Sequence, residues 1–286
     1  MNNLAAFMKR YPLWVCFALA FALSWGGLLA VVGFAAFIGR ADIPEAKMPL
    51  VYLAVLVGPS VAGVLLTAVI QGKSGLRALR TRLFKWRVGI RWYLMALFTA
   101  PLAMATTLLL IGWQNPEILP GITTADNIVA FVLTGIAGGL AAGIFEELGW
   151  TGFAVPQLRQ RYGILISGLI MGILWGAWHY PLFSGNGRSS GTLSPTLYLL
   201  VLLFSFLPAY RVLMVWVYDR TSSLLIAMLM HMSLTASTLI FQPLDTGLNA
   251  IIYDLGLTAV LWTIVAAVAL ANRRQLARYP YQKRTV

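Results

Sequence analysis

The sequence predicts an all-α protein, a polytopic transmembrane helix bundle of about eight helices. Of the 286 residues, 59% are hydrophobic and 10% are charged, whereas roughly a quarter of an ordinary soluble domain is charged. The apolar residues lie in long runs, and about 20 such residues are enough for a helix to cross a bilayer. Water could not surround so apolar a chain. We therefore expect residues 1–286 to form a single membrane-embedded domain.

Apolar runs bounded by charged residues, Pro or Gly indicate the individual spans. The predicted spans are 12–38, 49–71, 92–112, 127–150, 163–183, 197–217, 222–241 and 250–271. The first run is longer than the apolar part of a signal peptide, about 7–15 residues, so we expect a retained helix. The single cysteine, Cys16, lies in this run. An internal disulfide and a multi-cysteine metal site are therefore excluded.

The net charge of +12 could indicate a nucleic-acid partner, but its distribution favours the lipid bilayer instead. Of the 21 Lys and Arg residues, Arg40, Lys47 and Arg188 fall in one set of loops, Arg211 falls inside a span, and the other 17 fall in the alternate loops. This pattern predicts a multi-pass protein of a bacterial-type plasma membrane with both termini in the cytoplasm. The basic stretch 73–91 either lies on anionic headgroups or is a solvated loop.

The ionisable side chains inside the predicted spans include five that we single out, and each costs several kcal/mol there unless it is paired or hydrated. They are Glu146, Glu147, His179, Arg211 and His231. Two adjacent glutamates cannot both be ionised comfortably in lipid. One of them needs a proton or a cationic partner.

Helical spacing indicates which of these side chains share a face, because residues four apart are neighbours. The pairs are Glu146 with Trp150, Glu147 with Thr151, Trp175 with His179, and His231 with Thr235. Glu146 and His179 each lie about 16 residues from the turn between the fourth and fifth spans, which places both about 24 Å from it. The two side chains should therefore meet at one depth.

Glycines at intervals of four support close helix packing in this region. They are Gly135, Gly139 and Gly143 on the fourth span and Gly168, Gly172 and Gly176 on the fifth. Rows of small residues let membrane helices touch. We expect these rows to bring Glu146 and His179 together.

Carboxylate and imidazole groups in this pattern favour hydrolysis of a carbonyl, most plausibly a peptide bond. A carboxylate beside an imidazole can activate water, while a second imidazole and a hydroxyl stabilise the oxyanion. The same groups suit a catalytic zinc with one open position, for which Glu146, His179 and His231 are the candidate ligands. The residues leave both routes open.

At these positions the chain resembles the CPBP family of intramembrane proteases, the CAAX protease and bacteriocin-processing family, also called Abi. The family pattern is Glu-Glu-x-x-x-Arg, aromatic-x-x-x-His and His-x-x-x-Asn on three helices. Glu146 with Glu147, Trp175 with His179, and His231 match it in order and spacing, within a core at 127–240.

The resemblance implies an intramembrane endopeptidase acting on a peptide or a membrane-associated protein tail. Glu146 would be the general base with His179, Glu147 would support it, and His231 with Thr235 would stabilise the oxyanion. Trp150, Trp175 and Arg211 would line the substrate pocket or support the site. The family is classed among the metalloproteases, yet a metal-free mechanism is also argued for it, so a divalent cofactor such as zinc stays open.

Two positions depart from the family pattern. Thr151 stands where the pattern has Arg, and Thr235 stands where it has Asn. Thr235 can still donate a hydrogen bond, but Thr151 cannot replace a cation.

Arg211, just after an expected kink at Pro208, is the cation that could replace the missing arginine. One hypothesis is that Arg211 pairs with Glu147. The alternative is that it extends to the cytoplasmic interface near Asp219.

Two further function classes stay open from the sequence. One is a member of the same family that has lost catalysis and serves as a membrane scaffold. The other is a proton-coupled carrier in which Glu146 and His179 form a relay. We find no internal repeat, which counts against the carrier.

Overall fold

The computed structural model describes residues 3–38, 40–113, 115, 118–185, 200–201, 203–243 and 248–272. Within these ranges the chain is built of helices joined by short connections, and an isolated bridge links Pro120 to Pro243. The predicted all-α class is confirmed.

Six helical stretches of the described chain are long and apolar enough to cross a membrane. They are Pro12–Phe37 (α2), Glu45–Leu83, Ile90–Gly112 (α5), Ile128–Arg159, Leu224–Phe241 (α12) and Leu248–Ala271 (α13). The second contains α3 (Met48–Leu66) and α4 (Gly72–Leu83), and the fourth contains α6 (Ile128–Gly149) and α7 (Val155–Arg159). Shorter helices are α1 (Asn3–Arg10), α8 (Ile164–Trp178), α9 (Tyr180–Gly185) and α11 (Phe206–Thr221).

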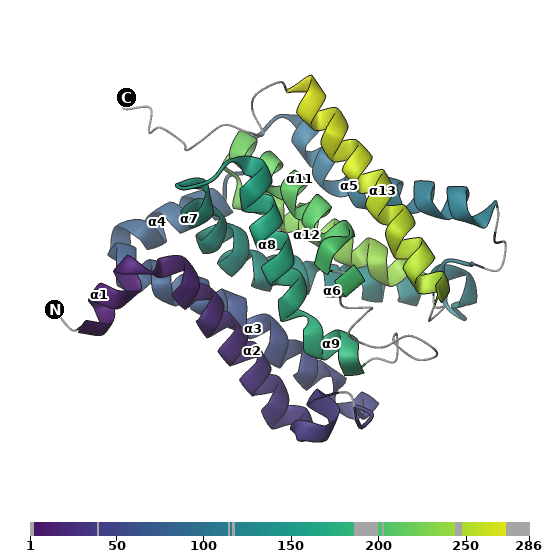
Figure 1. Ribbon diagram of the computed structural model, residues 1–286, viewed down its shortest axis with the longest axis horizontal. Helices are drawn as coiled ribbons and strands as arrows, with labels where there is room; N and C mark the ends of the chain where they lie inside the picture. Colours follow the sequence, from purple (N-terminus) through teal and green to yellow (C-terminus); the bar gives the residue numbers. More distant parts are fainter. Residues whose placement is uncertain are drawn as a thin grey trace.

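Four helices form the centre of the bundle, and two outer pairs flank them (Figure 1). On one side α2 packs against α3, and on the other α5 packs against α13. Between them, α12 lies against α6 and α5, while α11 lies against α8 and α13. The predicted site residues all lie on or next to the central helices α6, α8, α11 and α12.

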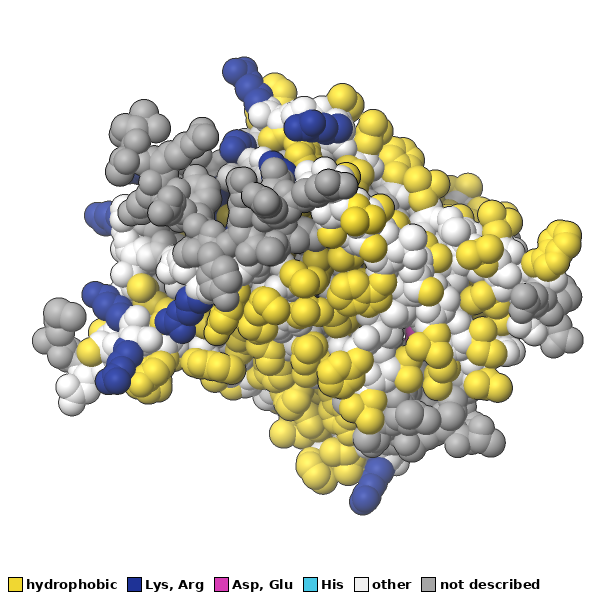
Figure 2. All heavy atoms as spheres, turned by 45° about the horizontal axis from the view of Figure 1, so that its top comes forward, with side chains coloured by type: hydrophobic (Ala, Val, Ile, Leu, Met, Phe, Trp, Pro, Cys, Tyr) yellow, Lys and Arg dark blue, Asp and Glu magenta, His cyan; other side chains and the backbone are white. Residues whose placement is uncertain are grey.

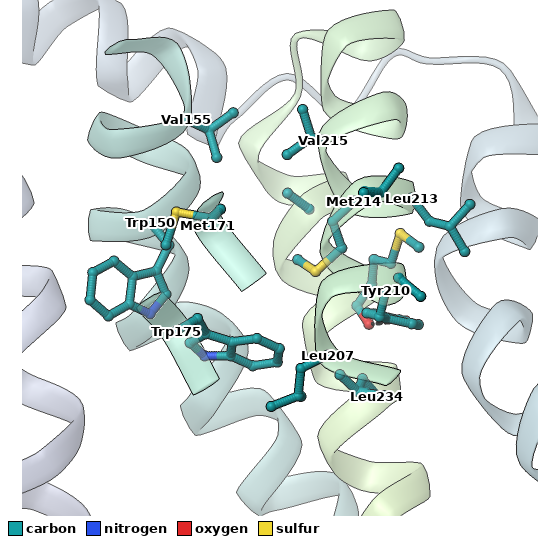
Figure 3. Close-up of a cluster of buried hydrophobic side chains, with 14 of the residues drawn as sticks. Trp150, Val155, Met171, Trp175, Leu207, Tyr210, Leu213, Met214, Val215 and Leu234 are labelled. Carbon is teal, nitrogen blue, oxygen red and sulfur yellow. Dashed lines mark hydrogen bonds between the residues drawn. The ribbon is translucent and has the colours of Figure 1, made fainter. Parts of the chain in front are cut away.

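Helix α11 is the core of the molecule, because every residue from Phe206 to Tyr218 is buried. In the close-up, Tyr210, Leu213 and Met214 are surrounded by side chains of neighbouring helices (Figure 3). A helix covered by protein on all sides does not have lipid as its solvent. It can therefore be shorter than a full span and can carry a charged residue such as Arg211.

Large apolar side chains cover the outside of the bundle. Leu102, Leu133 and Leu270 are exposed on three outward-facing helices. Figure 2 shows apolar side chains across the middle of one face, with most of the visible Lys and Arg toward its upper and left edges. Such a belt needs lipid around it. The protein is an integral, multi-pass membrane protein.

Two predicted spans differ from the structure. The expected helix over 163–183 is interrupted, because α8 ends at Trp178 and α9 begins at Tyr180. Pro181 explains the break, since a proline cannot donate to the preceding turn and its ring clashes there. The span expected over 197–217 is α11 at Phe206–Thr221, and 197–199 and 202 lie outside the described residues.

The chain does break next to Pro208, as expected: residues 203 and 204 are helical, Ser205 leaves helical backbone geometry, and α11 begins at Phe206. Pro208 lies in the first turn of α11, where an N–H would have no helical partner.

Candidate active site

The two glutamates lie at the end of α6, where the helix changes its geometry. Glu146 and Glu147 occupy its last turn, and a π-helical turn, Trp150–Ala154, follows directly. Such wide turns inside α-helices are frequent at functional sites. Both glutamate side chains are buried.

The glycine row of α6 packs against α12. A Cβ atom on Gly139 would lie 2.5 Å from the carbonyl oxygen of Met232, and one on Gly143 would lie 2.5 Å from that of Met228. Only glycine allows the two backbones to come this close. The contact brings His231, which lies between these two residues of α12, beside the glutamates.

The glycine row of α8 packs against α11. A Cβ atom on Gly168 would lie 2.5 Å from the Cα of Val212, and one on Gly172 would lie 2.4 Å from the Cα of Pro208. The prediction that the two rows join α6 to α8 is therefore wrong. A small-residue row shows that another backbone comes close, but it does not say which one.

Glu147 is held by three side chains from three segments. Its Oε1 lies 2.7 Å from Nη1 of Arg211 and 2.7 Å from Nδ1 of His231. The hydroxyl of Thr151 donates to its Oε2. The hypothesised pairing of Arg211 with Glu147 is present, and Asp219 instead pairs with Arg159 at 2.8 Å.

Glu146 accepts hydrogen bonds from two tryptophans. Its Oε2 lies 2.7 Å from Nε1 of Trp175 and 3.3 Å from Nε1 of Trp150. Nε2 of His231 lies 3.9 Å from the same oxygen. The hydrogen bond that joins α6 to α8 is thus made by Trp175, one turn before His179.

Trp175 links most of the polar groups of the site. Cζ of Arg211 stands 4.1 Å above its ring centroid. The rings of His179 and His231 each meet the Trp175 ring edge-to-face, with centroids 5.1 Å away. In Figure 3, Trp150 and Trp175 come from one side of the cluster, and the side chains of α11 come from the other.

His179 lies at the C-terminal end of α8, with Nδ1 2.8 Å from the carbonyl oxygen of Trp175. A carbonyl only accepts hydrogen bonds, so Nδ1 carries the proton and Nε2 is the basic nitrogen of the neutral ring. By the same argument the Glu147 carboxylate places a proton on Nδ1 of His231. Thr235 lies one turn after His231 and is half-buried.

Two features of the site are absent from the sequence prediction. The hydrogen bond from Trp175 to Glu146 could have been anticipated only in part, since a buried indole N–H needs an acceptor somewhere. Trp25 of α2 donates from Nε1 to the carbonyl oxygen of Trp178 at 3.0 Å, next to His179. No spacing rule joins residues this far apart in the chain.

The residues do not form a metal site in this arrangement. Among the residues that the structure describes, no group of three or more His, Cys, Asp or Glu is placed to hold a metal ion. The set Glu146, His179 and His231 is therefore not such a group. Both oxygens of Glu147 already have partners, and we derive no step through a metal.

Comparisons with known proteins find similarity over the segment that carries this site. Residues 128–237 match the family model described as type II CAAX prenyl endopeptidase Rce1-like. A protein from Methanococcus maripaludis named CAAX prenyl protease 2 is 30% identical over 139 residues, which is 47% of this chain and 48% of that protein. The alignment thus spans about half the length of this relative.

The matched segment runs from the start of α6 to the last turns of α12 and contains every site residue that the sequence predicted. The fold and the site define a multi-pass membrane protein with a buried glutamate–histidine centre. Over residues 128–237 the chain is similar to the CAAX prenyl endopeptidase family, in agreement with the resemblance of its motifs to the CPBP proteases.

Proposed function

We propose that this protein is an intramembrane endopeptidase of the CAAX-protease type. It would hydrolyse a peptide bond in a peptide or in a membrane-associated protein tail. The observation that carries the proposal is Glu146, buried in a segment that matches the family, with its Oε2 held 2.7 Å from the indole nitrogen of Trp175 and 3.9 Å from His231.

Glu146 is the general base in this proposal. The two indole N–H groups hold Oε2, so Oε1 takes a proton from the attacking water, and Nε2 of His179 orients that water. The water oxygen bonds to the carbonyl carbon of the scissile peptide. Glu146 then gives its proton to the departing amine as the carbon–nitrogen bond breaks.

His231 and Thr235 stabilise the oxyanion. Nδ1 of His231 donates to Glu147, so Nε2 can donate to an oxyanion only when the ring carries both protons. In this scheme Glu147 orients His231, and Trp150 and Trp175 line the site.

The protein would work in a bacterial-type plasma membrane with both termini in the cytoplasm. The 17-to-three distribution of basic residues over the alternate loops supports this orientation. The substrate class follows the family description, which names a prenyl endopeptidase. A suitable probe is therefore a peptide with a quenched fluorophore and an S-farnesyl cysteine followed by three C-terminal residues.

The test is cleavage of this probe by purified protein in proteoliposomes. Wild type should cleave it, and Glu146→Gln should lower kcat by about 10²- to 10⁴-fold, the range that a general base contributes. Glu45→Gln, a change of an exposed glutamate outside the site, should behave as wild type. A chelator should leave the rate unchanged, and a rate restored only by added zinc would assign a metal to the site.

The other outcomes separate the remaining function classes. If folded wild-type protein cleaves neither this probe nor an unprenylated peptide library, the protease hypothesis is wrong and the scaffold hypothesis is favoured. Proton flux that Glu146→Gln abolishes, without any cleavage, would favour the carrier.

A further inference from the structure

We infer that Arg211 supplies, from α11, the positive charge that the family pattern carries at position 151, in the π-helical turn that follows α6. In this role Arg211 is a positioning residue. It keeps Glu147 ionised and in place, and Glu147 in turn orients His231. The activity part of the test rests on the proposed function, whereas the stability part does not.

Position 151 faces Glu147 but brings no charge to it. The hydroxyl of Thr151 donates to Oε2 of Glu147, and the side chain is buried. An arginine here would reach the same carboxylate. The neutral hydroxyl leaves one buried carboxylate without a counter-charge from its own helix.

Arg211 approaches the same carboxylate from a different helix. Its Nη1 lies 2.7 Å from Oε1 of Glu147, and both side chains are 0% exposed. None of the three guanidinium nitrogens of Arg211 has an acceptor in hydrogen-bond geometry among the described residues, so its contact with Glu147 is a close ion pair. Burying a guanidinium is costly unless it is paired. Glu147 is its one acidic partner in the part of the chain that the structure describes, so the pair explains why the charge is there.

The packing of α8 on α11 fixes where Arg211 lies. Gly168 and Gly172 bring the α8 backbone against Val212 and Pro208, which stand on either side of Arg211 in the sequence. As a result the guanidinium lies over the face of Trp175, at 4.1 Å, and the ring adds a cation–π contact.

Arg211 acts on the reaction through Glu147. Oε1 of Glu147 is shared between Arg211 and His231, each at 2.7 Å. Without the guanidinium, two buried carboxylates would face one imidazole. A proton on Glu147 would then replace a charged acceptor of Nδ1 of His231 with a weaker neutral one, and the oxyanion donor would be held less firmly.

The test moves the charge back to position 151, in the π-helical turn that follows α6. Four variants are compared in proteoliposomes: Arg211→Gln, Thr151→Arg, the double variant, and Arg161→Gln as an exposed control. Arg211→Gln should lower kcat about a hundredfold with little change in KM, as expected when a catalytic group is misplaced by about 1 Å. Thr151→Arg alone should also lose activity, because two guanidinium groups would crowd one carboxylate. The double variant should recover most of the lost kcat.

Thermal unfolding in detergent gives the second measurement and needs no activity. Each single change should lower the melting temperature, and the double variant should melt above Arg211→Gln, because the buried carboxylate regains its counter-charge. Arg211→Lys keeps the charge and serves if Arg211→Gln does not fold. If wild type cleaves nothing, the proposed function fails, while the melting temperatures still decide the pairing.

Two results would overturn the inference. One is an Arg211→Gln variant with wild-type kcat and melting temperature. The other is a double variant no better than Arg211→Gln in both measurements, since a purely local packing role of Arg211 gives no rescue from position 151.

Discussion

At the scale of single residues, the indole of Trp175 connects the polar groups of the site. It donates to Glu146, lies under Arg211 and meets the rings of both histidines. A tryptophan has a large apolar ring and one N–H donor, so it can fill buried space and still hold a carboxylate.

Replacing Trp175 with phenylalanine separates these two contributions. Trp175→Phe keeps an aromatic face under Arg211 but removes the N–H donor to Glu146. We expect kcat to fall roughly ten- to a hundredfold, since a hydrogen bond to a charged group contributes about 1.5–3 kcal/mol. Cleavage assays in proteoliposomes measure this, with the exposed Trp113→Phe as the matched control. Equal rates for the two variants would contradict the orienting role.

Local pairs of the site were predictable and cross-helix pairs were not. The spacing of four residues placed Trp150 beside Glu146 and Thr151 beside Glu147, and both hydrogen bonds are present. Helix geometry alone determines such contacts. The bond from Trp175 to Glu146 depends on how two separate helices are rotated and offset, which spacing along one helix does not contain.

At the scale of helices, the glycine rows determine which backbones touch. Gly139 and Gly143 seat α6 on α12, and Gly168 and Gly172 seat α8 on α11. Each contact leaves no room for a Cβ atom. The site residues sit next to these contacts, so the helix separation sets the distances between them.

Alanine at Gly143 tests this dependence. Its Cβ atom would lie 2.5 Å from the carbonyl oxygen of Met228, and backbone cannot move aside as a side chain can. Gly143→Ala should lose about 1–3 kcal/mol of stability, the usual cost of overpacking, and should separate His231 from Glu147. Thermal unfolding and peptide cleavage are the measurements. Gly26→Ala is the control, because a Cβ atom there meets nothing within 4 Å. Equal stability of the two variants would count against close α6–α12 packing.

The long helices were predictable because length and hydropathy alone define them. The expected spans at 12–38, 92–112 and 222–241 agree with α2, α5 and α12 within two residues. The bounds of the shorter helices were harder to predict. Helix α8 stops before Pro181, and α11 is surrounded by protein rather than by lipid. Both hold residues of the site, whereas Glu146, Glu147 and His231 lie on α6 and α12, whose sequence signal is strong.

At the scale of the whole molecule, charged groups lie at the ends of the bundle and apolar groups around its middle. At one end Arg82 of α4 donates to the Tyr218 hydroxyl at 2.7 Å and to the carbonyl oxygen of Gly152 at 3.0 Å. At the other end Lys47 donates to the carbonyl oxygen of Val31 at 2.9 Å. The basic residues of α4 and the single lysine at 47 thus belong to opposite membrane surfaces.

Cysteine labelling tests the orientation that the charges favour. Cys16 is the one cysteine of the chain and is buried, so a Cys16→Ser background removes it. In that background, Thr81→Cys and Ala46→Cys place thiols at two exposed positions at opposite ends of the bundle. A membrane-impermeant maleimide should label position 46 in intact cells and position 81 only after permeabilisation. The reverse pattern would place the termini outside the cytoplasm.

The burial of α11 also bears on how the protein is made. This helix carries Arg211, Asp219 and Arg220 within 16 residues, and a single arginine at the centre of a span costs about 2.5–3.5 kcal/mol during insertion by the translocon. α11 is therefore a poor candidate to leave the translocon into lipid by itself. We expect α11 to insert only after α6 and α8, which are synthesised earlier, because they provide Glu147 and a glycine-lined surface for it to pack against. The pairing of Glu147 and the order of assembly are thus both expected to depend on Arg211.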